Sequence, residues 1–273
     1  MGLRVNTNIF SLTAQTNLSN VSSRLGGNFS RLSSGLRIAT AADDAAGLGI
    51  SERMRAQVRS LHQAQRNADD GISLVQTAEG SLNELNSNLI RMRELAIQAS
   101  NGTLNTGDRL VVDGEYQALI EEIERVSTQA TFNGVHLFDG STTTLTFQVG
   151  TESGEVIDVT LEDLTTATLG IDSSDVTDVT NAQAALDLID TAVDTVSSLR
   201  GDLGAAQNRL GSTVRSIANQ SENLSAAESR IRDVDIAVET ADLTRNSILQ
   251  QSAVSVLSQA NVQPQIALSL LQG

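Results

Sequence analysis

Apolar residues recur every three to four positions over two long stretches of the chain, and this spacing predicts two long helices. With Leu61 taken as position a of a heptad, the a and d positions of the first stretch are apolar or glycine through six heptads, as far as Ala99. Such a pattern is typical of a helix that buries one narrow stripe against a partner helix. We expect this helix to run over residues 43–100, about 85 Å at 1.5 Å per residue.

The second stretch has the same period nearer the end of the chain, with an apolar residue at every seventh position from Ile189 to Ile231. Two of its d positions, Thr213 and Gln220, are polar, and such positions can fix register at some cost in stability. A shorter periodic stretch at residues 110–126 can pack alongside the two. The expected core of the rod comprises six residues: Leu82, Leu85 and Leu89, packed against Leu203, Leu210 and Ile217.

The middle of the chain changes from a helical to an alternating pattern. Leu145, Phe147 and Val149 alternate with polar residues, a turn rich in Gly and Ser follows, and a second β-rich run spans residues 156–161. This is a hairpin pattern. A region of about 50 residues buries little core by itself, so we expect it to lean on the helices. The predicted fold is mainly α, with long antiparallel coiled-coil helices forming a rod and a small β-hairpin region at about residues 131–180.

Both ends of the chain have amphipathic stripes that need a partner to cover them. The stripe residues are Leu18, Val21, Leu25, Phe29 and Leu32 near the start, and Leu249, Val256 and Leu257 near the end. Two interpretations are compatible: the two ends pack on each other, or they are buried against neighbouring subunits. We expect residues 1–42 and 235–273 to form one helical domain, and residues 43–180 and 181–234 to form the rod.

Composition supports narrow helical seams. Apolar residues reach 40% while aromatic residues are only 2%, and Pro264 is the single proline, so helices can run long. The chain has no cysteine, which excludes disulfides and thiolate metal sites. It also lacks an apolar run of the length that a cleavable signal peptide or a membrane span requires, so we expect no membrane insertion.

The net charge of −15 is concentrated in one region. All 18 basic residues are arginines, and residues 126–199 contain 12 acidic residues and no arginine. So many unpaired carboxylates are costly to bury, and we expect this region to face solvent. Nucleic acid is not an expected partner, because binding to phosphates needs clustered basic side chains.

No arrangement of residues predicts catalysis. The two histidines, His62 and His136, are far apart in sequence, and the chain contains no HExxH motif. The run Gly47-Leu48-Gly49 follows no predicted strand, so it lacks the context of a phosphate-binding loop. We therefore expect no catalytic, cofactor-binding or metal site, no cofactor, and a protein that is not an enzyme.

Short blocks at both ends of the chain resemble those of bacterial flagellins, and they occur in the order of that family. The blocks are Leu32-Ser33-Ser34-Gly35-Leu36-Arg37-Ile38, Asp43-Asp44-Ala45-Ala46-Gly47, Arg66-Asn67-Ala68, Arg93-Glu94-Leu95-Ala96 and Thr131-Phe132-Asn133-Gly134, and then Ser229-Arg230-Ile231, Ile248-Leu249-Gln250-Gln251, Ser258-Gln259-Ala260-Asn261 and Leu268-Ser269-Leu270-Leu271. Each block is weak alone, but eight or more in family order at both ends are highly specific, and the resemblance covers nearly the whole chain.

The resemblance implies a secreted, extracellular subunit of the flagellar filament, a helical tubular homopolymer that serves as a propeller for swimming. The two extreme ends would form an inner domain that lines the filament channel. Residues 133–181 leave no room for a variable outer domain, so the chain resembles a short form of the family. The implied partners are other copies of the chain, hook–filament junction and cap proteins, and a cytosolic chaperone of type III export.

The resemblance also implies a site for the flagellin-sensing Toll-like receptor of vertebrate hosts, at Arg91, Leu95 and Glu115. Arg91 and Leu95 are four residues apart, hence on one helix face, and that face lies off the a and d positions of the heptad. We expect both side chains to be exposed there. The alternative is that both contact the next subunit, and the two uses are compatible.

Two other classes of protein share part of this pattern. A flagellar junction protein has similar terminal helices but usually a larger middle, and a generic secreted coiled-coil scaffold or adhesin explains the heptads but not the ordered blocks.

Overall fold

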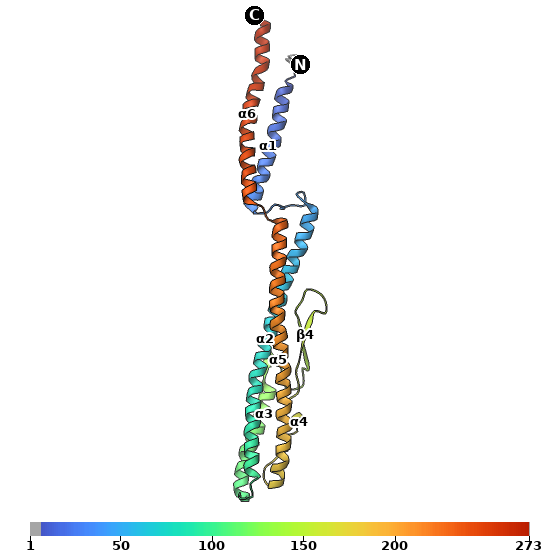
Figure 1. The fold of residues 1–273 in the computed structure, drawn as a ribbon, viewed down its shortest axis with the longest axis vertical. Helices are drawn as coiled ribbons and strands as arrows, with labels where there is room; N and C mark the ends of the chain where they lie inside the picture. The colour runs from blue at the N-terminus through green and yellow to red at the C-terminus, as the bar shows by residue number, and fades with distance from the viewer. Residues whose placement is uncertain (1–6, 273) are drawn as a thin grey trace. The chain divides into compact units, whose positions relative to one another are not determined.

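The structure is a computed structural model that describes residues 7–272, with side-chain environments as far as residue 264. Its elements follow in the order α1 (Ile9–Ser34), α2 (Ala45–Ala99), α3 (Thr106–Gln129), β1 (Thr131–Phe132), β2 (Val135–His136), β3 (Thr144–Gln148), β4 (Val156–Thr160), α4 (Thr166–Leu169), α5 (Val179–Arg232) and α6 (Ile236–Gln272) (Figure 1). The predicted fold class, mainly helical with small antiparallel hairpins, is confirmed.

The chain divides into two compact units. The central unit comprises Gln57–Glu222, and the terminal unit comprises Met1–Ala56 together with Asn223–Gly273. Both α2 and α5 contribute residues to each unit, so the units divide within helices and not at the helix ends near residues 43 and 235. The domain boundaries expected at those helix ends stay a prediction about how the parts function.

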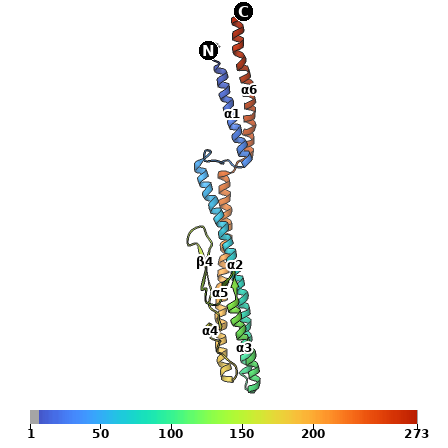
Figure 2. The ribbon, with the colours of Figure 1, turned by 180° about the vertical axis from the view of Figure 1, so that it is seen from behind.

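The central unit is built on the α2 heptad, which packs beside α3 and α5 in both ribbon views (Figures 1 and 2). Every a and d position from Leu61 to Ala99 is buried. Leu82, Leu85 and Leu89 are fully buried in one cluster with Leu203 of α5 and with Tyr116 of α3. The heptad prediction for this helix is therefore confirmed.

The partners expected for part of this seam are corrected by the direction of α5. Ion pairs join Glu79 to Arg200 and Arg93 to Asp190, so residue numbers on α5 fall as those on α2 rise. Leu210 consequently lies beside Gly71, in a second cluster with Ala68, Val149 and Ile157, and not beside Leu82, Leu85 and Leu89. Ile217 is also buried, farther along the same seam.

The predicted hairpin is formed by β3 and β4, which pair antiparallel with Leu145 opposite Val159 and Phe147 opposite Ile157. It approaches α2 closely at Gly71. A Cβ atom at that position would lie 3.3 Å from the Phe147 ring and 3.2 Å from Leu210 Cδ1. The glycine therefore lets the Phe147 ring and Leu210 approach α2 without a shift of either side chain, and this contact anchors the hairpin on the helices, as expected.

The segment that follows the hairpin is fastened to α3 by buried polar contacts. The Tyr116 hydroxyl lies 2.8 Å from Ser174 Oγ, and burial raises the pKa of this phenol. Asp113 accepts a hydrogen bond from the Val176 backbone N–H, and Glu124 accepts one from that of Thr166, each at 2.9 Å. The segment thereby satisfies its backbone groups and closes the core around Tyr116.

The burial of the α2 seam predicts a contrast between two adjacent residues. Leu85→Ala should lower the free energy of unfolding by about 2–5 kcal/mol, because it leaves a cavity among tightly packed leucines. Glu84→Ala, on the exposed face, should cost about 0.5 kcal/mol or less. Thermal and denaturant unfolding measure both changes, and equal shifts for the two variants would contradict the assigned seam.

Candidate assembly surface

The terminal unit pairs the two ends of the chain through α1 and α6, which run side by side (Figure 1). Asn8 begins α1, since its side-chain Oδ1 accepts a hydrogen bond from the Ser11 backbone N–H at 3.1 Å. Gly35 ends the helix in the left-handed conformation, with φ of 72°. Asp235 starts α6 by accepting a hydrogen bond from the Ala237 backbone N–H at 2.9 Å. Each helix thus has a polar residue that fixes where it begins.

The segments that lead out of α1 and into α6 are paired with each other. The Val234 N–H donates to the Gly35 carbonyl at 3.0 Å, and the Arg37 N–H donates to the Arg232 carbonyl at 2.7 Å. Arg232 also forms an ion pair with Glu52 of α2 at 2.6 Å. These contacts hold the beginnings and ends of the helices together within the terminal unit.

The α1–α6 pair buries few apolar side chains. Among the residues with described side chains, the buried apolar residues of the terminal unit are Ala14, Ile38 and Ala260. The same unit holds twelve of the eighteen exposed large apolar residues: Ile9, Phe10, Leu12, Phe29, Ile50, Ile236, Val238, Ile248, Leu249, Val254, Val256 and Val262. An apolar surface of this extent marks an interaction site.

Some residues of the predicted terminal stripes pack between α1 and α6, and others are left exposed for a neighbouring subunit. Within the α1–α6 pair, five of the stripe residues are half-buried: Leu18, Val21, Leu25, Leu32 and Leu257. The other three point outward, with Phe29 57%, Leu249 44% and Val256 58% exposed. The ends therefore pack on each other and still leave apolar side chains for a further partner.

A polar cluster lies within the helix pair. Asn28 is 2% exposed and Glu239 is 8% exposed. Asn28 donates to Glu239 Oε1, Arg31 Nε donates to the same oxygen at 2.9 Å, and Asn246 Nδ2 donates to Asn28 Oδ1 at 2.8 Å. Glu239 stands in the first turn of α6 and Arg31 in the last turn of α1, where both charges also complement the helix dipoles.

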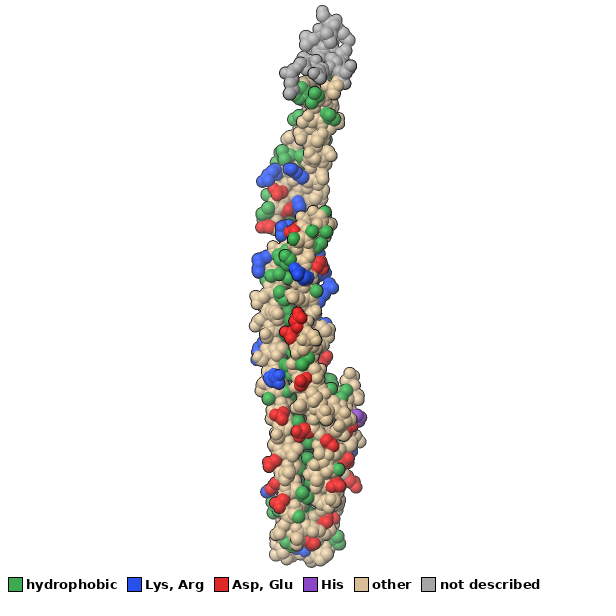
Figure 3. Space-filling view, turned by 90° about the vertical axis from the view of Figure 1, so that its right-hand side faces the viewer, with side chains coloured by type: hydrophobic (Ala, Val, Ile, Leu, Met, Phe, Trp, Pro, Cys, Tyr) green, Lys and Arg blue, Asp and Glu red, His purple; other side chains and the backbone are tan. Residues whose placement is uncertain are grey.

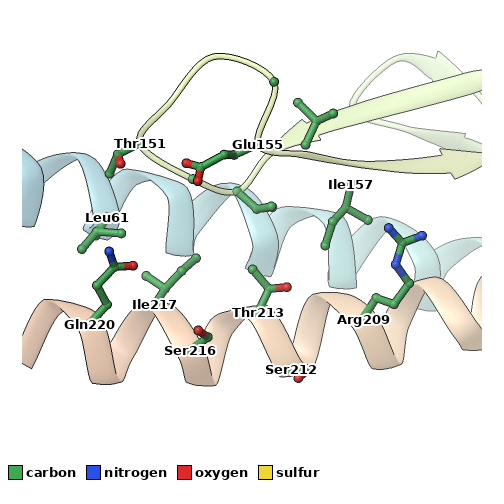
Figure 4. A pocket seen from close by; sticks show the side chains of 14 residues that line it. Leu61, Thr151, Glu155, Ile157, Arg209, Ser212, Thr213, Ser216, Ile217 and Gln220 are labelled. Atoms are coloured by element: carbon green, nitrogen blue, oxygen red, sulfur yellow. The ribbon is translucent and has the colours of Figure 1, made fainter.

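A groove in the central unit is a second candidate site (Figure 4). It lies between α2, α5 and the loop that joins β3 to β4, and Leu61, Ile217 and Gln220 reach into it from the two helices. Its remaining lining consists mainly of hydroxyl and backbone groups, with Glu155 on the loop and Arg209 on α5 as the charged side chains. This lining offers no nucleophile paired with a base.

The described residues offer neither a metal site nor a membrane span. The part of the chain that the structure describes contains no group of three His, Cys, Asp or Glu side chains placed to hold a metal ion. Within the same residues, none of the helices carries a stretch apolar enough to span a bilayer.

The residues of the expected receptor site are only partly brought together. Arg91 and Glu115 meet on the surface, with Arg91 Nη2 2.7 Å from Glu115 Oε1, and this hydrogen bond raises the pKa of Arg91. Leu95 is only 2% exposed, so the prediction of an exposed Leu95 is wrong. Leu95 occupies heptad position g, and the packing of α3 beside α2 extends the buried stripe from positions a and d to g.

Family models match both parts of the chain that contain these helices. Residues 5–143 match the bacterial flagellin N-terminal helical region, and residues 186–271 match the bacterial flagellin C-terminal helical region. The chain belongs to the flagellin family. A flagellin of Halalkalibacterium halodurans is 53% identical over 244 residues, covering 89% of this chain and 90% of that protein. A flagellin of Bacillus subtilis is 44% identical, covering 99% of this chain and 100% of that protein.

A solved structure supports the fold. The crystal structure of Bacillus cereus flagellin is 31% identical and superposes with a TM-score of 0.52, over 60% of this chain and 94% of that chain. Flagellins are structural proteins that assemble into the flagellar filament and are not enzymes, so the predicted function as a filament subunit is confirmed.

The pattern of the sequence missed part of the surface of this flagellin. Ile236 and Val254 are exposed on α6 but were not assigned to the terminal stripe. They are 18 residues or five turns apart, so they share one side of the helix, which differs from the side of Leu249 and Val256. A stripe assigned from residues spaced three to four positions apart includes only one side of the helix, so the apolar residues on another side were missed.

Charge is divided unequally between the two units of this flagellin. The central unit carries 25 acidic residues and 9 arginines, a net charge of −16, whereas the terminal unit carries 8 acidic residues and 9 arginines, a net charge of +1. Figure 3 shows acidic side chains spread over the surface of the central unit. The terminal unit thus offers a nearly neutral surface, whereas we expect the acidic central units of neighbouring copies to repel one another.

This division predicts that polymerisation depends on salt. Raising ionic strength from about 0.01 to 0.15 M shortens the screening length from about 30 to 8 Å, so assembly should improve, measured as a lower critical concentration in sedimentation. A variant combining Glu162→Gln, Asp172→Asn and Asp187→Asn, all at exposed positions, should need less salt. Assembly that is best at very low salt, or a triple variant that behaves as wild type, would argue against the repulsion.

Proposed function

We propose that this flagellin polymerises through the outer faces of α1 and α6, and that the resulting filament lies outside the cell and serves swimming. The observation that carries the proposal is the excess of exposed apolar side chains on the terminal unit, twelve of the eighteen large ones among the described residues. A second copy that covered them would remove from water the surface that the helix pair leaves open.

The energetic argument favours these faces over the central unit. Full burial of one Val, Leu, Ile or Phe side chain contributes about 1.5–3 kcal/mol, so a few such residues per neighbour can hold a polymer of many repeated contacts. The central unit already buries most of its leucines internally and carries a net charge of −16. Its surface is therefore suited to solvent more than to close apolar contact.

The test replaces exposed apolar residues that contribute little to the folding of a single chain. Phe29→Ser combined with Val256→Ser should raise the critical concentration of polymerisation by about tenfold or more, since each change removes about 1.5–3 kcal/mol of burial at the contact. Far-ultraviolet circular dichroism of the monomer should stay unchanged. Negative-stain images and sedimentation measure the assembly.

Matched controls on the same two helices are Ser22→Ala and Gln259→Ala, both at exposed polar positions. They should polymerise as the wild-type chain does. Long filaments formed by the Phe29 and Val256 double variant at wild-type concentrations would exclude these faces from the contact.

The same faces are suited to two other kinds of partner: a chaperone that binds the chain before secretion, and proteins that contact the subunits at the two ends of the filament. We propose that a cytosolic export chaperone covers α6 before secretion, because Ile248, Val254 and Val256 would otherwise be open to aggregation. Hook–filament junction and cap proteins would contact the terminal subunits through the α1 and α6 faces that lack a neighbouring copy there.

A receptor site on the central unit is the remaining proposed interaction. Arg91 and Glu115 form an exposed pair at which the flagellin-sensing Toll-like receptor would bind the monomer. Arg91→Ala should reduce potency in a cell reporter by at least about tenfold, or about 1.4 kcal/mol. Leu95→Ala is unsuitable, since Leu95 is a core residue whose loss would destabilise the fold.

Arg125→Ala is the matched control for the receptor experiment. Arg125 is an equally exposed arginine, paired with Glu122 on α3. Its loss should leave potency unchanged. If Arg91→Ala and Arg125→Ala had equal potency, with helix content retained in both, Arg91 would not belong to the site.

A further inference from the structure

Pro264 lies inside α6, where it interrupts the regular hydrogen bonding of the helix. In an α-helix the N–H of each residue donates to the carbonyl four residues earlier. Proline has no N–H, so the carbonyl of Ala260 receives no such bond from position 264. Ala260 is buried, and an unsatisfied carbonyl is costly in a site shielded from water.

The donor for this carbonyl comes from the opposite end of the chain. Asn8 Nδ2 donates a hydrogen bond to the Ala260 carbonyl at 2.8 Å. The Oδ1 atom of the same side chain accepts the bond from the Ser11 N–H that begins α1. One turn farther along α1, the buried Ser11 hydroxyl lies 2.7 Å from Asn261 Oδ1. The start of α1 is thus joined to α6 at the interruption that Pro264 creates.

We propose that Asn8 is a positioning residue that recognises the carbonyl freed by Pro264 and thereby sets the register of α1 on α6. Because α6 carries apolar residues on several sides, apolar burial alone would allow more than one pairing. In the interior of α6, the missing N–H of Pro264 distinguishes the Ala260 carbonyl from its neighbours, so only one pairing of the two helices brings Asn8 to it. Together with the polar cluster around Asn28 and Glu239, this bond holds the pair at two points far apart along the helices.

The consequence for assembly rests on the proposed function. Register decides how the open sides of α1 and α6 are aligned along the pair, and so how Phe29 and Val256 are placed relative to each other on the surface that a neighbouring copy meets. A pair that slipped by one heptad would shift one helix by about 10 Å against the other at 1.5 Å per residue. Such a subunit would present a different surface and would add poorly to a filament.

The chemistry of the asparagine side chain allows an experiment that separates its two roles. Asp caps helices as well as Asn does, but an ionised carboxylate has no N–H to donate. Asn8→Asp therefore keeps the cap of α1 and removes the bond to Ala260. Pro264→Ala returns an N–H to α6, so that Ala260 no longer needs Asn8. The test is a double-mutant cycle of these two substitutions in the full chain.

Asn8→Asp alone should raise the critical concentration of polymerisation by about tenfold, the ratio expected from one unsatisfied buried carbonyl. In the Pro264→Ala background the same substitution should raise it by a clearly smaller factor, because Ala260 then has a donor within α6 and only the effect of the added charge remains. The added charge is the same in both backgrounds, so only the interruption at Ala260 explains the difference. Thermal melting of the helices in the monomer, followed by circular dichroism, should show the same coupling.

Two outcomes would overturn the inference: wild-type assembly by Asn8→Asp, or an equal loss in both backgrounds. If Pro264→Ala alone prevents assembly, the melting cycle decides, with equal effects of Asn8→Asp in the two backgrounds again excluding the role. Failure of the wild-type chain to polymerise would instead count against the proposed function, and the melting cycle would still decide the role of Asn8.

Discussion

Two helices that pack against each other bury only the narrow seam between them. This limit on the apolar surface that a helix pair can bury determines the properties of the terminal unit. A seam of this kind hides only part of each helix, so an apolar helix pair without a third layer keeps exposed apolar side chains. The terminal unit therefore buries Ala14, Ile38 and Ala260 but leaves residues such as Phe29 and Val256 exposed. These exposed apolar side chains leave the unit incomplete as an isolated domain and make it suitable for contact with other copies.

The central unit buries more of its apolar surface, because further elements pack against its pair of long helices. The packing of α3 covers position g of the α2 heptad, and the β3–β4 hairpin covers the stretch around Gly71, where the helix side chains are too small to fill the seam. Most of its apolar side chains are then buried within the chain, and its surface can carry nearly the whole net charge. The division between a self-sufficient acidic unit and an incomplete neutral unit follows from the number of layers in each.

The sequence predicted the α2 seam residue by residue, because a strict heptad leaves little freedom in which side is buried. It was wrong about Leu95, since a heptad analysed as a pair of helices does not contain the third helix that covers position g. It placed Leu210 opposite the wrong part of α2, because the pattern specifies the buried side of α5 and not its register. The contact between Asn8 and Ala260 could not be predicted, although Pro264 was evident, because the sequence does not show which distant group fills the gap.

The burial of Tyr116 has an optical consequence. The chain has no tryptophan and one tyrosine, and the phenol of that tyrosine lies in the core of the central unit, against Ser174. Intrinsic fluorescence and near-ultraviolet absorbance of the side chain therefore report on one unit only. The tyrosine signal therefore follows the central unit by itself, and a loss of helical circular dichroism without a change in tyrosine fluorescence can be assigned to the terminal unit.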